Sequence, residues 1–285
     1  MEHIIYLNGY LLPRSRARIS PFDHGFLYGY ALFETMRARS GNIFRLERHL
    51  ARLAGSAELI NLPLEGLDLG QACYDTLRAN GLDDARIRLT VSIGEGECIP
   101  EPPASPEPTV FIVATAYTPP PADTYRDGFT AVVSSIRQNS FTPLARLKSA
   151  NYLNNVLARQ EAKEMGADEA LLLNERDRLC EGSTSNIFLV SRGILVTPDE
   201  ESGCLPGITR QAVIELAAEA GIGVEQREVL PEEVLQADQA FLTSSLLGLM
   251  PLREVDGSPI GEREERAITT KLMAAYNDLV QRETA

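Results

Sequence analysis

The chain has few of the residues on which many metal sites and catalytic centres depend. Among its 285 residues there are three histidines and four cysteines. The cysteines, at positions 73, 98, 180 and 204, form no CxxC pair and have no histidine at metal-ligand spacing. We therefore expect reduced thiols, no metal site and no catalytic centre based on histidine.

Positive charge and long apolar runs are also scarce. Lysine and arginine number 27 against 40 acidic residues, a net charge of -13, and no basic face is evident that could bind nucleic acid. No apolar run approaches the roughly 18–20 residues that span a bilayer. The first residues, Met1 to Tyr6, lack the basic and apolar regions of a signal peptide. We expect a cytoplasmic protein that binds neither nucleic acid nor a membrane.

The apolar pattern predicts both helices and strands. Asn8-Gly9, between two short apolar runs, predicts a β-hairpin. Helices are predicted over about 45–60, 150–165 and 209–220, and from about 262. Strands are predicted near 86–93, 110–116, 130–135, 169–173, 187–190, 194–197 and 240–243, with a Pro- and Gly-rich loop over 94–108.

This order of elements favours an α+β fold in two domains. Most strands follow one another closely, as in hairpins, and do not alternate regularly with helices as in a parallel-sheet enzyme. Prolines 119–121 form a stiff connector. We place a small N-terminal α/β domain at 1–119, a linker at 120–126 and a larger, β-rich C-terminal domain with helices at 127–285.

Lys148 is the first candidate for chemistry, because it lies where an irregular segment meets a predicted helix. The free N–H groups of a helix start would lower the pKa of its ammonium, and imine formation needs the neutral amine. Tyr152, one helical turn later, would share a face with Lys148, and its phenol could donate to a phenolate oxygen. The alternative is an exposed lysine at a helix start.

Three later features would complete such a site. Glu181 lies between two predicted strands, where a buried carboxylate could hold a proton on a pyridine nitrogen; a surface turn is the alternative. Gly207-Ile208-Thr209 begins a helix whose first N–H groups, with the Thr209 hydroxyl, could bind phosphate or could be a plain N-cap. A hydroxyl cluster follows at Thr243-Ser244-Ser245.

Arg52 is a further phosphate candidate. It lies on the helix predicted over 45–60, four residues after Arg48. A guanidinium fork onto phosphate is one interpretation, and a solvated basic face is the other. Taken with the lysine, the carboxylate and the helix start, it predicts a pyridoxal phosphate site.

In this order the segments resemble the class IV pyridoxal phosphate aminotransferases. This fold-type IV group includes branched-chain and D-amino-acid aminotransferases, R-selective amine transaminases and aminodeoxychorismate lyase. The similarity runs from Leu7-Asn8-Gly9 to Pro251. Its most specific part reads Lys148, Asn-Tyr-Leu, Asp-Glu-Ala-Leu-Leu-Leu, Glu-Gly-Ser-x-Ser-Asn and Leu-Pro-Gly-Ile-Thr-Arg210.

The resemblance implies a role for each matching residue. Lys148 would be the Schiff-base lysine and would move the proton between Cα and C4′, Glu181 would pair with the pyridine nitrogen, and Tyr152 would contact the ring oxygen. Asn186 would brace the loop that carries Glu181. The phosphate would be held by Arg52, Ile208, Thr209 and Ser245, next to Ser244.

The resemblance also implies a homodimer with its sites at the interface, where Tyr28 would reach into the partner's site. Phe33 stands where the D-amino-acid enzymes use tyrosine. Arg86 and Arg88 alternate with Ile87 on a predicted strand and so share a face. One of them, Arg88 first, would bind the substrate α-carboxylate, unless both simply face solvent.

No subfamily motif is complete in this chain. It lacks the Thr-Arg-Gly and histidine of the D-amino-acid enzymes, and the Phe-Glu-Gly and Thr-Gly-Thr-Ala of the branched-chain enzymes. We expect an aminotransferase that moves an amino group, by ping-pong half-reactions, from a D- or branched-chain L-amino acid to a 2-oxo acid such as 2-oxoglutarate. A lyase that releases pyruvate from aminodeoxychorismate, and a non-catalytic protein that binds pyridoxal phosphate, are the alternatives.

Overall fold

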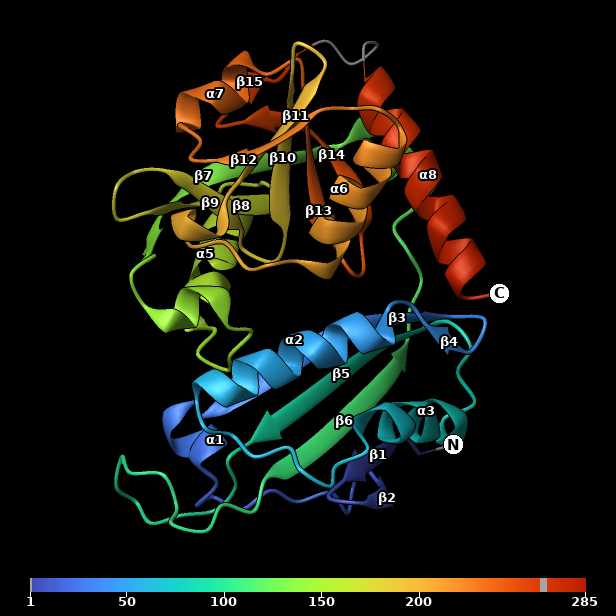
Figure 1. The fold of residues 1–285 in the computed structure, drawn as a ribbon, viewed down its shortest axis with the longest axis vertical. Coiled ribbons are helices and arrows are strands. Elements are labelled where there is room, and N and C mark those ends of the chain that lie inside the picture. Colours follow the sequence, from blue (N-terminus) through green and yellow to red (C-terminus); the bar gives the residue numbers. More distant parts are fainter. Residues whose placement is uncertain (1, 262–265) are drawn as a thin grey trace. The chain divides into compact units, whose positions relative to one another are not determined.

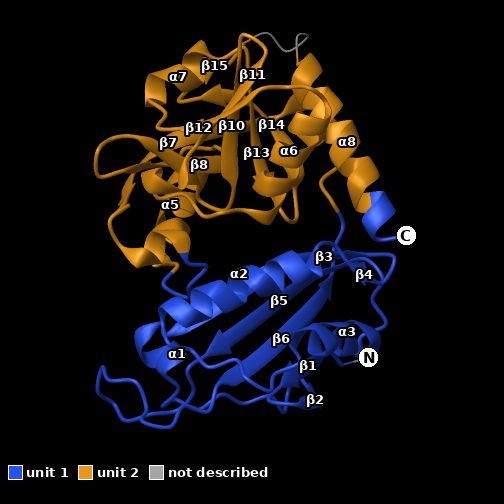
Figure 2. Ribbon diagram, in the orientation of Figure 1, with its two compact units in different colours: residues 1–118, 147–151, 281–285 blue, residues 119–146, 152–280 orange. Residues whose placement is uncertain are grey.

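The computed structural model describes residues 2–261 and 266–285. The chain forms two compact units, coloured separately in Figure 2. Unit 1 comprises Met1–Thr118, Leu147–Asn151 and Gln281–Ala285, and unit 2 comprises Pro119–Arg146 and Tyr152–Val280. The short segment with Lys148 thus belongs to unit 1. The domain limits at residues 119 and 127 stay a prediction.

Unit 1 is built on a six-stranded antiparallel sheet in the order β2-β1-β6-β5-β3-β4 (Figure 1). The predicted hairpin is present, and Asn8 and Gly9 have φ of 46° and 89°, as a type I′ turn requires. The strands are β1 (Ile4–Leu7), β2 (Tyr10–Pro13), β3 (Ala31–Arg39), β4 (Asn42–Ile43), β5 (Ala85–Ser92) and β6 (Thr109–Ala116), and the helices are α1 (His24–Tyr28), α2 (Leu46–Leu59) and α3 (Leu69–Ala79).

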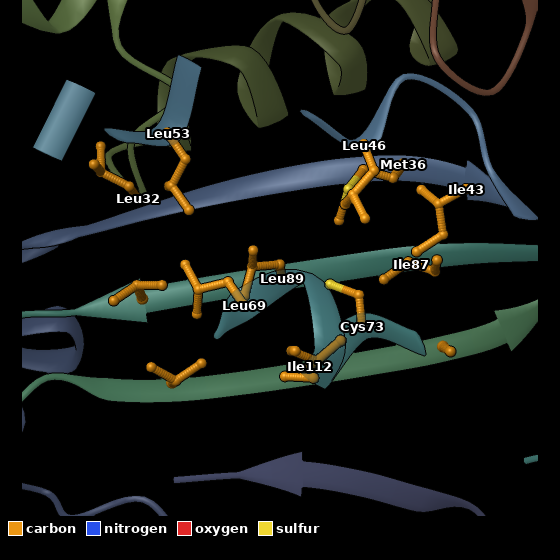
Figure 3. Close-up of a cluster of buried hydrophobic side chains, with 14 of the residues drawn as sticks. Leu32, Met36, Ile43, Leu46, Leu53, Leu69, Cys73, Ile87, Leu89 and Ile112 are labelled. Atoms are coloured by element: carbon orange, nitrogen blue, oxygen red, sulfur yellow. The ribbon is translucent and has the colours of Figure 1, made fainter. Parts of the chain in front are cut away.

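The two faces of this sheet differ in chemistry because side chains alternate along each strand. On one face, Leu32 and Met36 of β3 and Leu89 of β5 pack with Leu53 of α2 in an apolar core (Figure 3). Glu34 lies between Leu32 and Met36 and so points to this core side. The opposite face carries the odd residues of β3 and the even residues of β5, which include Phe33, Arg37, Arg86 and Arg88.

Unit 2 contains a nine-stranded mixed sheet in the order β12-β11-β10-β13-β14-β7-β8-β9, with β15 against β14. Three neighbouring pairs are parallel: β11 with β12, β14 with β7, and β7 with β8. The expectation of mostly hairpin-linked strands therefore holds for unit 1 more than for unit 2. The strands are β7 (Phe129–Gln138), β8 (Glu169–Asn174), β9 (Leu179–Gly182), β10 (Asn186–Ser191), β11 (Ile194–Pro198), β12 (Val224–Arg227), β13 (Gln239–Ser244), β14 (Gly248–Val255) and β15 (Ser258–Pro259).

The main helices of unit 2 contact this sheet: α5 packs on β7 and β8, and α6 on β12 and β13. The helices are α4 (Ala122–Asp127), α5 (Leu153–Glu164), α6 (Ile208–Glu219), α7 (Pro231–Gln236) and α8 (Ala267–Glu283), with 3-10 turns at Pro143–Arg146 and Glu200–Ser202. The predicted start of the last helix near 262 lies outside the described residues. In the part of the chain that the structure describes, no helix is long and apolar enough to cross a membrane. The mixture of helices and sheets confirms the α+β prediction.

Candidate active site

Lys148 lies on a short extended segment that adds to the edge of β3. The amide of Phe33 donates to the Lys148 carbonyl at 2.8 Å, and the amide of Ala150 donates to the Ala31 carbonyl at 2.8 Å. Ser149 forms a β-bridge with Leu32 between these two bonds. The Lys148 ammonium lies 4.7 Å from the centroid of the Phe33 ring. Backbone pairing therefore fixes the lysine over the sheet face that carries Phe33.

This placement corrects the sequence interpretation of Lys148. Helix α5 begins at Leu153, five residues later, and Tyr152 is its N-cap. Lys148 is therefore not at a helix start, and the argument from free helical N–H groups does not apply to it. Tyr152 does not share a helical turn with it either. The helix predicted over about 150–165 is present but begins three residues later, because pairing with β3 satisfies the backbone groups around Ser149.

Arg52 takes part in a buried charged cluster on the core side of the sheet. Its Nε donates to Glu34 Oε1 at 2.8 Å, and its Nη2 donates to Glu34 Oε2 at 2.6 Å. His49 Nδ1 lies 2.7 Å from Glu34 Oε2. Arg52 has a side chain only 10% exposed, so it does not belong to a solvated basic face, whereas Arg48 is exposed.

The electrostatics of this cluster favour an ionised Glu34 and a neutral His49. Burial opposes ionisation of Glu34, but the charge of Arg52 and the hydrogen bonds from Arg52 and His49 outweigh it and lower its pKa to about 2. Burial lowers the pKa of His49, against the opposing effect of Glu34. The ring of His49 is thus a neutral donor to Glu34, and the cluster carries one negative and one positive charge.

The opposite face of the same sheet is basic. The Arg88 guanidinium lies 3.6 Å from the centroid of the Phe33 ring. Arg86 is directly opposite Arg37 in the pairing of β5 with β3, although like charges in that position repel. The Nε of Arg37 is buried and has no hydrogen-bond partner among the described residues, and the same holds for Oγ1 of Thr90 on this face. The face therefore has donors and positive charge placed for an anion.

Arg37 was missed in the sequence, although a signal existed. Alternation from Phe33 along the strand places Arg37 on the face of Arg86 and Arg88 once β3 is aligned with β5. Its guanidinium also lies 5.6 Å from the centroid of the Tyr117 ring. Burial raises the pKa of Tyr117, while Arg37 and Arg86 both oppose that shift, so these three side chains are close neighbours.

In unit 2, Glu181 is a buried, hydrogen-bonded carboxylate in β9. It is 8% exposed, so the surface-turn interpretation is wrong. Its Oε2 accepts from Asn186 Nδ2 at 3.2 Å and from the Leu205 amide at 3.0 Å. Asn186 also donates to the Leu205 carbonyl at 2.9 Å. The amide of Asn186 thus links Glu181 to the segment that leads into α6.

The loop after Glu181 is held by a second carboxylate that the sequence did not identify. Buried Glu169 accepts from the hydroxyls of Ser183, Thr184 and Ser185. Tyr152 donates its hydroxyl proton to the Ser183 carbonyl at 3.0 Å. A phenol has a single proton, so donation to a ring oxygen would need this bond to be exchanged.

The start of α6 is close to these groups. Its N-cap, Gly207, supplies no side-chain cap, and Ile208 and Thr209 are buried. The Thr209 hydroxyl is 3.5 Å from the Tyr276 hydroxyl. Thr243 pairs with Asn186 across β13 and β10, and its buried Oγ1 has no hydrogen-bond partner among the described residues. A helix start without a side-chain cap and a buried hydroxyl without a partner are features expected where an anion binds.

Ser244, Ser245 and Tyr28, which were also predicted for the site, have only local contacts among the described residues. Ser244 Oγ accepts from the Leu247 amide at 3.2 Å and so closes the turn after β13. Ser245 lies in that turn and is half-buried. Tyr28 ends α1, and its ring meets that of His24 edge-on with centroids 5.0 Å apart.

Comparison with known proteins identifies the family. Residues 31–255 match the family model described as amino-transferase class IV. The chain belongs to the class IV aminotransferases. A Methanocaldococcus jannaschii protein with a provisional branched-chain-amino-acid aminotransferase name is 39% identical over 278 residues, 96% of each chain. The solved Escherichia coli branched-chain amino acid aminotransferase has a TM-score of 0.94 and 31% identity, covering 100% of this chain and 97% of that one.

A solved structure named as a lyase is less similar to this aminotransferase than the E. coli enzyme is. A Legionella pneumophila protein with a provisional 4-amino-4-deoxychorismate lyase name has a TM-score of 0.84 and 26% identity, covering 93% of this chain and 97% of that one. The family and the fold-type IV architecture predicted from the motifs are thus confirmed, and the protein is an enzyme.

Class IV aminotransferases use pyridoxal 5′-phosphate, and the residues of this aminotransferase fit that group. The uncapped start of α6 and the orphaned Thr243 hydroxyl suit a phosphate. Buried Glu181 suits a protonated ring nitrogen, and Lys148 carries an amine of the kind that an imine with the cofactor would need.

Proposed function

We propose that this enzyme is a pyridoxal phosphate-dependent branched-chain-amino-acid aminotransferase that works by ping-pong half-reactions. An L-amino acid such as leucine is the donor, and 2-oxoglutarate is the acceptor. The observation that carries the proposal is near full-length similarity to proteins named for this activity, at 33–39% identity for the M. jannaschii protein and the E. coli enzyme. A lyase is less well supported, because the lyase-named structure is the more distant one.

When bound, the cofactor supplies an electron sink for the bonds at the substrate Cα and carries nitrogen between the half-reactions. In our proposal the Lys148 amine would hold the cofactor and would move the proton between Cα and C4′. Glu181 holds a proton on the ring nitrogen, while Asn186 and the Leu205 amide keep its carboxylate in place.

We assign the phosphate to the backbone N–H groups of Ile208 and Thr209, the Thr209 hydroxyl and the Ser244-Ser245 turn as donors, with Arg52 as the cation. A helix start without a side-chain cap and the helix dipole support anion binding at α6. Tyr152 is assigned to the ring oxygen, for which its hydroxyl must leave the Ser183 carbonyl.

We assign substrate carboxylate binding to the basic face of the unit 1 sheet. Arg88, stacked on Phe33, is the first candidate, with Arg86 beside it. Arg37 joins them, because its buried Nε has no hydrogen-bond partner among the described residues. A planar guanidinium binds a carboxylate through two parallel hydrogen bonds.

A homodimer is also proposed, with Tyr28 reaching into the partner's site. Large apolar side chains around α1 support it, since Phe26 is 76% exposed and Phe22 and Tyr28 are exposed as well. We expect the native mass to be twice the chain mass and Phe26→Asp to lower it; a monomeric wild type would refute the dimer.

A cytoplasmic location is supported by cysteines that form no disulfide in the described residues.

The activity is tested by absorbance of the purified holoenzyme, without acceptor, after addition of L-leucine or D-alanine in turn. We expect the cofactor band to change with L-leucine only and to return on addition of 2-oxoglutarate. A response to D-alanine alone would move the donor to the D-amino acids. Pyruvate release from aminodeoxychorismate, with no response to either amino acid, would establish the lyase instead.

A further inference from the structure

The cluster of Glu34, His49 and Arg52 is a buried polar group with no role assigned above except to the arginine. His49 and Arg52 are three residues apart on α2 and so share a helix face. Glu34 reaches them from β3, and its side chain is only 1% exposed. Leu32, Met36 and Leu53 belong to the apolar core on the same side of the sheet (Figure 3).

The geometry restrains Arg52 strongly. Glu34 accepts from both Nε and Nη2, so it grips one edge of the guanidinium plane and fixes its rotation as well as its position. His49 donates to Oε2, the same oxygen that accepts from Nη2, and so limits rotation of the carboxylate. A long arginine side chain otherwise loses much rotamer freedom when it binds a ligand.

A purely structural role would be better served by apolar residues. Replacing a buried ion pair by well-packed hydrophobic side chains is often neutral or stabilising, so such a pair adds little stability by itself. A neutral histidine as third member adds a donor without adding charge, which is useful for orienting a carboxylate and unnecessary for joining a helix to a sheet. Orientation of the Arg52 guanidinium therefore explains this cluster better than a contribution to stability does.

We propose that Glu34 and His49 are positioning residues that preset the Arg52 guanidinium for the phosphate of the cofactor. This inference rests on the proposed function, in which Arg52 binds that phosphate. Because the orientation is set before binding, the cofactor's phosphate gains a donor that needs no further ordering. Glu34 and His49 then act through Arg52 and need no contact with the cofactor.

The test compares two ligands of the apoenzyme that differ only in the phosphate: pyridoxal 5′-phosphate and pyridoxal. Dissociation constants are measured by absorbance titration for the wild type and for Glu34→Gln. Gln keeps one oxygen that can accept from Arg52 but can no longer accept from both Nε and Nη2. We expect roughly tenfold or greater weakening for pyridoxal phosphate and less than twofold for pyridoxal. Glu47→Gln, on the exposed start of α2, is the matched control and should change neither constant.

A double-mutant cycle with Arg52→Ala separates positioning from general damage. If Glu34 acts through Arg52, adding Glu34→Gln to Arg52→Ala should weaken pyridoxal phosphate binding by less than twofold more. Independent, multiplicative losses would overturn the proposal. So would equal weakening for both ligands, which is the result expected from a distorted fold.

The histidine gives a second test if Glu34→Gln does not fold. Asn at position 49 keeps a side-chain N–H near the place of Nδ1, whereas Leu of similar size has no donor. We expect His49→Asn to retain the preference for pyridoxal phosphate over pyridoxal and His49→Leu to lose it severalfold. Equal preference in both variants would overturn the role of His49. A wild type that binds neither ligand would instead contradict the proposed function.

Discussion

Arg88 shows how much of the substrate assignment depends on a single side chain. Its guanidinium lies 3.6 Å above the Phe33 ring, on the face where Arg37 and Arg86 are paired. We expect Arg88→Ala to raise KM for amino acids roughly 10- to 100-fold, because a charge-assisted bidentate bond is lost. KM for an amine without a carboxylate should stay unchanged. Arg78→Ala, exposed on α3, is the control; equal effects on both substrates would refute the assignment.

Glu181 offers a second test with a nearly isosteric change. In Glu181→Gln the carbonyl oxygen can still accept from Asn186 and the Leu205 amide, so the remaining amide nitrogen is left to donate. A donor cannot hold a proton on the ring nitrogen. We expect pyridoxal phosphate to stay bound and Cα proton transfer to slow on the order of 100-fold, measured in single turnovers with Cα-deuterated leucine. An unchanged rate would remove this role from Glu181.

At the scale of the element, the start of α6 depends on close backbone packing. A Cβ at Gly207 would lie 2.0 Å from Asn186 Oδ1, so Gly207→Ala must displace either the helix start or the residue that braces Glu181. We expect a lower Tm and weaker binding of pyridoxal phosphate. At Gly55, inside α2, a Cβ would meet no other described atom within 4 Å, so Gly55→Ala should stabilise by about 0.4–1 kcal/mol. Thermal unfolding and absorbance titration of both variants check this contrast.

The elements also show where sequence reasoning succeeds and where it fails. Local patterns predicted α2, α6 and the first hairpin closely, because apolar spacing and turn residues are local properties. Lys148 was placed at a helix start because its own sequence neighbourhood resembles one. The actual backbone partner of Lys148 is Phe33, and that of Ala150 is Ala31, both more than a hundred residues earlier, and no local pattern contains that pairing.

The same limit applies to the site. Lys148, Glu181 and Thr209 could be selected because they lie in ordered, recognisable motifs. Glu34 and Glu169 could not, since their importance depends on partners that other elements bring to them: a histidine and an arginine of α2 in one case, three hydroxyls of the loop after β9 in the other. A buried carboxylate in an apolar strand is a signal, but only the fold shows what it binds.

For the whole molecule, the buried cluster on α2 predicts loss of stability in mild acid. Burial lowers the pKa of His49, so below about pH 6.5 the unfolded chain binds a proton there that the folded chain does not. The unfolded state then binds more protons, and the free energy of unfolding falls as pH decreases. The carboxyl of Glu34 has a pKa of about 2 in the folded chain and near 4.5 in the unfolded chain. Below about pH 4.5 the unfolded chain therefore binds a proton at Glu34 that the folded chain does not, and the free energy of unfolding falls further.

His49→Asn separates this contribution from that of the other groups. Asn can still donate to Glu34 but does not titrate, so the variant should lose the decrease in stability that begins below about pH 6.5 and keep the decrease below pH 4.5. For the apoenzyme we expect the wild type to lose more free energy of unfolding than His49→Asn as the pH falls below about 6.5. Urea unfolding at pH 7.5, 6.0, 5.0 and 4.0 measures it. Identical slopes in wild type and variant would mean that His49 accepts its proton inside the fold, and hence that Glu34 and Arg52 tolerate a second positive charge beside them.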